Sequence, residues 1–201
     1  MLRVTCRMWF LLKSCGGAIL GAALLIGISA AHQMAFAGAA DVPTIIAAAG
    51  SRHADPGLEA LLPTSLGGVA LTIESQAGAD LSTTSGPFDA FLESLGKTRD
   101  DFTIASAYSE GSLRAEVGAW RVRGADPALL LPGFRRAVQA SSTTPLTQVE
   151  ETIAGRKVTR IGDPGQLTRG PLYVIVRGDA LLFVQTPEPA LAEEAVGKLP
   201  D

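Results

Sequence analysis

Apolar residues recur at regular spacing along most of the chain after residue 55. Alternation of apolar and polar positions predicts strands over residues 69–74, 102–108, 113–122, 149–153 and 157–161. Two almost continuous apolar runs, 172–176 and 181–184, flank the turn Arg177-Gly178-Asp179 and predict a central hairpin. In 113–122 the apolar phase changes near Gly118, which predicts a β-bulge.

Four helices are expected between these strands. Apolar residues at positions i, i+3, i+4 and i+7 predict a helix over 87–95, which starts at Pro87. Capping residues followed by proline predict three further helix starts, at Asp55-Pro56, Asp126-Pro127 and Thr186-Pro187. Pro132-Gly133 predicts a kink or an early end in the third helix. The sequence therefore predicts an α+β fold with about four helices and an antiparallel sheet of about six to seven strands.

Two segments, 120–130 and 182–192, are similar to each other. Val122 corresponds to Val184, and Asp126-Pro127 corresponds to Glu188-Pro189. The similarity is consistent with two tandem units, 55–140 and 146–201, in which a hairpin leads into a helix. The alternative is that both segments share only the chemistry of a helix start.

The N-terminal segment has the pattern of an export signal. Arg3, Arg7 and Lys13 precede an apolar run over 18–31, and Ala35-Phe36-Ala37 supplies small residues for cleavage between Ala37 and Gly38. An uncleaved anchor is the alternative, although the 17 residues from 15 to 31 are fewer than the ~20 that span a bilayer. We therefore expect a signal peptide or anchor over 1–37, a flexible spacer over 38–54 and one domain over 55–201.

Cleavage would remove most of the reactive side chains. Both cysteines, all three methionines and one of the two histidines precede residue 38, so His53 is the only imidazole after it. All 20 acidic residues and 14 of the 17 basic ones follow residue 37, which gives that part a net charge of −6. This composition argues against zinc or thiol chemistry and against binding to nucleic acid or anionic lipid. We expect no cofactor, no metal, and membrane contact only through the N-terminal segment.

Two groups of residues are candidates for chemistry. Ser51, His53 and Asp55 are the residue types of a hydrolase triad, but positions two apart on a strand lie too far apart for direct contact. A group of basic residues is a candidate site for an anionic ligand or partner. It comprises Arg114, Arg121, Arg123, Arg135 and Arg136. The alternative for this group is a solvated surface with weak ion pairs.

Three short motifs extend over most of the domain: Leu62-Pro63, Gly67-Gly68-Val69 and Leu199-Pro200. With them the layout resembles uncharacterised bacterial exported and lipoprotein-like α+β domains, and this resemblance implies no known activity. The expected function is therefore a non-catalytic extracytoplasmic domain, secreted or tethered in the cell envelope, that binds an envelope protein or a ligand. The alternative is a small carboxylate- or serine-dependent hydrolase acting on the envelope, which needs two ionisable groups that meet in a pocket.

Overall fold

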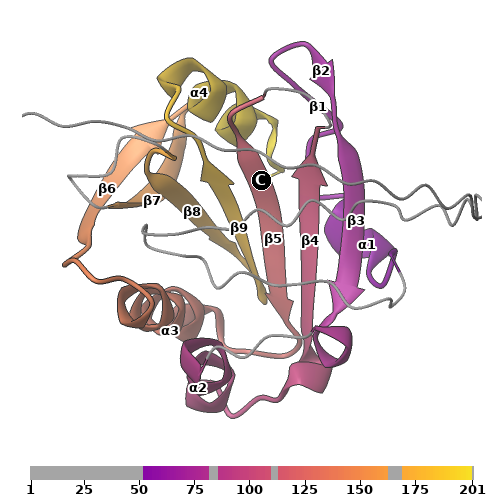
Figure 1. Ribbon diagram of the computed structural model, residues 1–201, viewed down its shortest axis with the longest axis vertical. Coiled ribbons are helices and arrows are strands. Elements are labelled where there is room, and N and C mark those ends of the chain that lie inside the picture. The colour runs from indigo at the N-terminus through magenta and orange to yellow at the C-terminus, as the bar shows by residue number, and fades with distance from the viewer. Residues whose placement is uncertain (1–51, 82–85, 110–112, 163–168, 201) are drawn as a thin grey trace, which may run out of the picture. The chain divides into compact units, whose positions relative to one another are not determined.

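Seven antiparallel strands form the main sheet of the computed structural model, which describes residues 52–81, 86–109, 113–162 and 169–200 (Figure 1). The order across the sheet is β3-β4-β5-β9-β8-β7-β6, and a separate two-stranded sheet pairs β1 with β2. The strands are β1 (Ser65–Leu66), β2 (Val69–Ala70), β3 (Thr72–Ala77), β4 (Phe102–Tyr108), β5 (Glu116–Val122), β6 (Thr147–Ile153), β7 (Arg156–Gly162), β8 (Leu172–Arg177) and β9 (Ala180–Gln185). β9 occupies the centre, as the apolar hairpin predicts. The expected signal peptide and its Ala37–Gly38 cleavage site lie outside the described residues.

The described residues contain four α-helices, which confirms the predicted α+β class. They are α1 (Pro56–Glu59), α2 (Gly86–Ser94), α3 (Pro127–Ala140) and α4 (Pro189–Lys198), with short 3-10 turns over Gly78–Asp80 and Arg99–Asp101. The Asp55 carboxylate accepts from Leu58 N at 2.8 Å, and that of Asp126 accepts from Ala128 N at 2.9 Å, so both caps form as expected.

Two of the predicted helix boundaries are wrong. α3 continues through Pro132 to Ala140, so the helix is not shortened there. α4 starts at Pro189 rather than at Thr186-Pro187. The Thr186 hydroxyl instead donates to the Arg114 carbonyl at 2.8 Å and accepts from Glu188 N at 3.1 Å, which fixes the end of β9 before the helix begins.

Helices cover both faces of the main sheet. α2 and α3 pack on one face, and the cluster they form with the sheet includes Phe88, Trp120 and Phe134. α1 and α4 belong to a second cluster, which contains the alternate residues of the same strands, such as Ala119 and Leu182. The sheet therefore lies between two helical layers, and its central strands are buried on both sides.

Burial on both sides explains why the predicted β-bulge at Gly118 is wrong. Val117 and Ala119 face one helical layer, whereas Trp120 and Val122 face the other. The pairing of β5 with both β4 and β9 continues without an inserted residue. Gly118 instead leaves room for the ring of Phe183, which a Cβ at this position would overlap.

The N-terminal part of the domain differs from the expected pattern in two ways. The predicted strand over 69–74 divides into β2 and β3, because Leu71 leaves the main sheet and bonds through its N–H to the Thr64 carbonyl at 2.9 Å. Residues 52–54, at the end of the expected spacer, pair with β3: Ser75 N donates to Arg52 O at 2.9 Å, and Ala54 N donates to Ser75 O at 3.2 Å.

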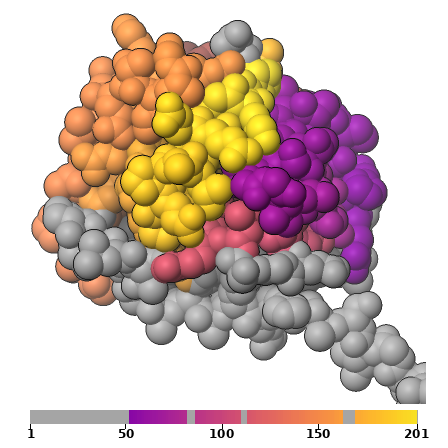
Figure 2. Space-filling view, turned by 90° about the horizontal axis from the view of Figure 1, so that it is seen from above, coloured from indigo at the N-terminus to yellow at the C-terminus, as the bar shows by residue number. Residues whose placement is uncertain are grey.

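The C-terminal helix is tied to the β1–β2 hairpin. Lys198 Nζ donates to Ser65 O at 3.0 Å, and the Glu194 carboxylate accepts from Gly67 N at 3.1 Å. Hydrogen bonds from Lys198 and from Gly67 lower the pKa of Glu194. Seen from above, the yellow C-terminal segment lies between the orange strands and the purple N-terminal part of the domain (Figure 2).

The two proposed tandem units are not shown by the structure. Each unit does contain a hairpin that leads into a helix, β4–β5 into α3 and β8–β9 into α4. The two helices, however, pack on opposite faces of the sheet. Within the described part of the chain, no helix is both long and apolar enough to span a bilayer.

Candidate functional site

Arg121, the first of the predicted binding residues, is committed to contacts inside the protein. Its Nη1 lies 2.6 Å from Asp55 Oδ2, and its Nε lies 3.5 Å from Asp179 Oδ1. The other oxygen of Asp55 caps α1. Arg121 therefore links α1 to β5 and to the β8–β9 turn, and two carboxylates already neutralise its charge.

Arg114 and Arg123 lie at opposite ends of β5. Arg114 precedes the strand, and its carbonyl accepts from Thr186 Oγ1 at 2.8 Å. Arg123 follows the strand, and its N–H donates to the Asp101 carbonyl at 2.8 Å. The pocket lined by Arg135 and Arg136 includes none of the other three arginines, so the structure does not bring the five arginines into one site.

Arg135 and Arg136 lie on α3, where they line a groove between that helix and the edge strand β6. The groove has a volume of about 430 Å³. Its lining consists of Pro132, Arg135, Arg136, Gln139, Ala140, Leu146, Thr147, Gln148 and Ile161. Both arginines are exposed, and neither forms an ion pair with another described residue. Arg136 Nη2 donates to Ser94 Oγ at 3.5 Å, a long hydrogen bond to a neutral group that leaves the charge of the guanidinium uncompensated. This α3–β6 groove combines an apolar floor with two available cations.

Hydrogen bonds within the protein hold the walls of the groove. Gln139 Nε2 donates to Thr144 O at 3.1 Å, and Gln139 Oε1 accepts from Leu146 N at 2.9 Å. These bonds tie the linker between α3 and β6 to the last turn of the helix. At the start of β6, Thr147 Oγ1 donates to Gly162 O at 3.0 Å. The groove is therefore preformed, which lowers the entropic cost of binding a ligand.

Gln148 is the residue of the groove that the sequence analysis missed. Its Oε1 atom is buried and has no hydrogen-bond partner among the described residues. A buried acceptor without a donor is unusual, because it loses its bonds to water without replacement. The sequence held no signal for it, since the alternating pattern of β6 does not show which side-chain atoms the tertiary structure buries.

The triad considered at Ser51, His53 and Asp55 does not form among the described residues, and Ser51 lies outside them. His53 Nδ1 lies 3.1 Å from Glu59 Oε1, while Asp55 pairs with Arg121. Glu59 also accepts from Ser75 Oγ at 2.6 Å, but Ser75 is 1% exposed and cannot reach a substrate. The contacts of these residues therefore link the segment 52–55 to α1 and β3.

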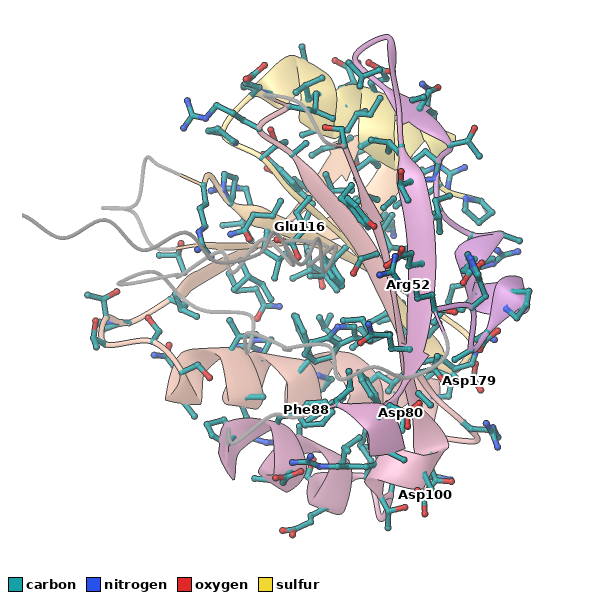
Figure 3. All side chains as sticks on the ribbon, turned by 45° about the vertical axis from the view of Figure 1, so that its right-hand side comes forward. Arg52, Asp80, Phe88, Asp100, Glu116 and Asp179 are labelled. Atoms are coloured by element: carbon teal, nitrogen blue, oxygen red, sulfur yellow. The ribbon has the colours of Figure 1, made fainter. Side chains whose placement is uncertain are left out.

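Glu116 is the first residue of β5, in the main sheet (Figure 3). The residue as a whole is exposed, but the surrounding protein desolvates its carboxyl and raises the pKa of that group. The charge of Arg169 acts in the opposite direction. A raised pKa means that ionisation of Glu116 lowers stability as the pH rises above its ordinary value of 4.5.

Neither a metal centre nor a known relative suggests another site. In the parts of the chain that the structure describes, no three His, Cys, Asp or Glu side chains gather as metal ligands would. Compared with known proteins, the chain matches no family model, no curated protein and no solved structure. Of the described pockets, the α3–β6 groove is the one lined by arginines, and we use it to infer a function.

Proposed function

We propose that this chain is a non-catalytic domain of the bacterial cell envelope that binds an anionic ligand in the α3–β6 groove. The observation that carries the proposal is the placement of Arg135 and Arg136, without described acidic partners, on the wall of a preformed groove. Arginine binds carboxylate and phosphate groups through several N–H donors at once. In a chain with a net negative charge, two exposed cations without described acidic partners favour the binding of an anion locally.

A binding role is favoured over hydrolysis by the chemistry of the same groove. None of its lining residues is an acid, a serine or a histidine, and its single hydroxyl, that of Thr147, is bonded to a backbone carbonyl. General acid–base catalysis requires a proton donor or acceptor within reach of the substrate. The groove offers cations and amides instead, which bind but do not transfer protons at neutral pH.

Removal of either arginine should weaken anion binding. We expect the full chain to bind cyclohexyl phosphate, and Arg135→Gln and Arg136→Gln each to weaken that binding by about tenfold, because each removes hydrogen bonds from a charged donor. Isothermal titration calorimetry measures the affinities. Arg177→Gln is the matched control, since Arg177 is also exposed and lies outside the groove.

Two results would contradict binding in the groove. One is an affinity that stays the same in both α3 variants. The other is a loss in Arg177→Gln as large as that in the α3 variants, because the effect would then follow the net charge of the protein rather than the site.

The location in the envelope is tested separately through the N-terminal segment. Expressed from Met1 in a bacterium, the chain should be recovered outside the cytoplasm, and mass spectrometry should show that it begins at Gly38. Ala37→Lys should block the cleavage, since the last residue before the cut must be small. A chain that remains in the cytoplasm with Met1 would rule out export, whereas an envelope-bound chain that keeps Met1 would identify the segment as an anchor.

A further inference from the structure

A second pocket lies on the opposite face of the sheet from the α3–β6 groove, where α4 lies beside β6 (Figure 1). It has a volume of about 310 Å³, and its core residues belong to the cluster under α1 and α4. Its apolar residues are Ile153, Ala154, Pro189 and Ala192, and its polar residues are Thr152, Tyr173 and Glu193. This α4 pocket therefore combines apolar walls with two hydroxyls and one carboxylate.

Tyr173 brings an unpaired hydroxyl to the wall of the α4 pocket. The residue is 9% exposed, and it belongs to the core. Its hydroxyl has no hydrogen-bond partner among the described residues, but it is not sealed from solvent as Trp120 Nε1 and Gln148 Oε1 are. A buried hydroxyl without a partner is costly, so a ligand atom that bonds to it gains free energy.

The Tyr173 hydroxyl stays protonated at neutral pH. Desolvation of the hydroxyl and the charge of Glu151 raise its pKa above the ordinary value of 10.0, while Arg160 acts in the opposite direction. Arg160 Nε also lies 3.4 Å from Glu151 Oε1, so these two charges largely compensate each other. The pocket therefore receives a neutral hydroxyl, whose oxygen can accept a hydrogen bond.

Glu193 is the charged residue among those that line the α4 pocket. It is exposed and forms no ion pair with another described residue. Its neighbours four positions away on α4 are Pro189 and Gly197, which carry no charge. The adjacent Glu194 differs, because its carboxylate lies 2.6 Å from Lys198 Nζ. The pocket therefore presents one negative charge that no described cation neutralises.

We propose that the α4 pocket binds a primary alkylammonium group. An ammonium carries a positive charge and three hydrogen-bond donors but no acceptor, so it matches a carboxylate and a hydroxyl oxygen. It pairs with Glu193 and donates to the Tyr173 oxygen. Its alkyl chain covers Ile153, Ala154 and Ala192, which removes apolar surface from water. The bond to the carboxylate is the stronger of the two, because both of its partners are charged.

Other charged ligands fit this pocket less well. A carboxylate or phosphate would meet the negative charge of Glu193, and no arginine, lysine or histidine lines the pocket. A calcium or magnesium ion needs about six oxygen ligands, whereas no three acidic, histidine or cysteine side chains gather in the described parts of the chain. A guanidinium group is planar and directs its outer N–H donors sideways. Beside the carboxylate, those donors would face apolar side chains that accept no hydrogen bond.

Titration of the full chain with pentylamine, followed by nuclear magnetic resonance, tests the site. At neutral pH we expect the backbone amide signals of Ala154 and Ala192 to shift and to saturate. Glu193→Gln should weaken the binding about tenfold and Tyr173→Phe about threefold, because the first removes a charged acceptor and the second a neutral one. Neither change breaks a hydrogen bond between described residues, so both variants should keep dispersed spectra. Glu150→Gln is the matched control, since Glu150 is also exposed but lies outside the pocket, and it should leave the affinity unchanged.

Several results would overturn the ammonium site. One is the absence of shifts at Ala154 and Ala192, and another is an affinity that Glu193→Gln leaves unchanged or that Glu150→Gln lowers as much. We expect 1-pentanol to bind at least about tenfold more weakly than pentylamine, so equal binding would show that the charge is not recognised. Equal or tighter binding of butylguanidine or of pentanoate would replace the ammonium by a guanidinium or an anion.

The same titration separates this site from the proposed anion site. Arg135→Gln should leave the binding of pentylamine unchanged, because Arg135 lines the α3–β6 groove and not the α4 pocket. Loss of pentylamine binding in that variant would contradict the ammonium site. Failure of cyclohexyl phosphate to bind concerns the groove alone.

Two further probes distinguish the sources of the amine. Cadaverine represents a free amine, and Nα-acetyl-lysine N-methylamide represents a lysine side chain of a partner protein. Tighter binding of cadaverine supports a small ligand, whereas equal or tighter binding of the lysine derivative supports a partner protein. If neither binds while pentylamine does, the class is limited to amines with a purely apolar chain. Each of these results supports the alkylammonium site.

Discussion

Replacement of Trp120 by alanine should lower the free energy of unfolding by about 3–5 kcal/mol. Trp120 is 0% exposed, and rings from both α2 and α3 and from two neighbouring strands surround it. The ring centroids lie at 5.1 Å for Phe134, 5.4 Å for Phe102, 5.8 Å for Phe88, 6.0 Å for Phe91 and 6.3 Å for Phe183. Phe88 points from α2 toward the sheet (Figure 3). Alanine would leave a cavity that these rings cannot close without moving both helices.

Urea denaturation followed by far-ultraviolet circular dichroism measures this loss. Trp120→Phe is the control: Trp120 Nε1 is buried with no partner among the described residues, so the change to phenylalanine breaks no described hydrogen bond. We expect this smaller cavity to cost about 1–2 kcal/mol, and the variant keeps the test valid if Trp120→Ala does not fold. A loss below about 1 kcal/mol in Trp120→Ala would mean that the cluster does not hold the two helices on the sheet.

Local chemistry made the helix starts predictable from the sequence. Asp55 and Asp126 accept from N–H groups two or three residues ahead, and such contacts need nothing from the rest of the fold. Glu188 is an exception. It occupies the N-cap position of α4, but its side chain accepts no hydrogen bond from the N–H groups of the first turn. The likeness between 120–130 and 182–192 thus extends to the order of residues but not to their capping contacts.

Long-range pairing was not predictable in the same way. The change of apolar phase near Gly118 indicated a bulge, because the expectation assumed a strand with one buried face. The structure places β9 beside β5 and a helical layer on each face, so both phases are buried and the strand stays regular. An alternating pattern cannot show this, since the second layer comes from segments far away in the chain.

The same limit applies to the candidate site. The cluster of basic residues identified Arg135 and Arg136, which line the groove, together with Arg121, which does not. Arg121 is neutralised by Asp55, a residue 66 positions earlier in the chain. The burial of Gln148 Oε1 became visible only in the tertiary structure. The residue type shows which side chains could bind an anion. Only the tertiary structure shows which of them are already paired with a carboxylate.

Replacement of Gly170 by alanine should lower the free energy of unfolding by about 2–5 kcal/mol. Gly170 has a φ of +74°, in the left-handed region that a side chain makes costly. A Cβ would also overlap the Thr186 carbonyl and stand 2.5 Å from the Pro187 Cα. All of these are backbone atoms, so no side-chain rotation relieves the contact. The chain that enters β8 would have to move away from the end of β9.

Gly178→Ala separates strain from contact. Gly178 has a φ of +56° in the β8–β9 turn, and a Cβ at this position would meet no atom within 4 Å, so only the backbone strain of about 1 kcal/mol is expected. The difference between the two variants in thermal or urea unfolding measures the close approach at Gly170. Thr186 is hydrogen-bonded to Arg114 O and Glu188 N. The close packing of Gly170 against Thr186 therefore also helps to fix the start of α4. Equal losses in the two variants would show that the end of β9 can move without cost, and that these hydrogen bonds do not hold it in place.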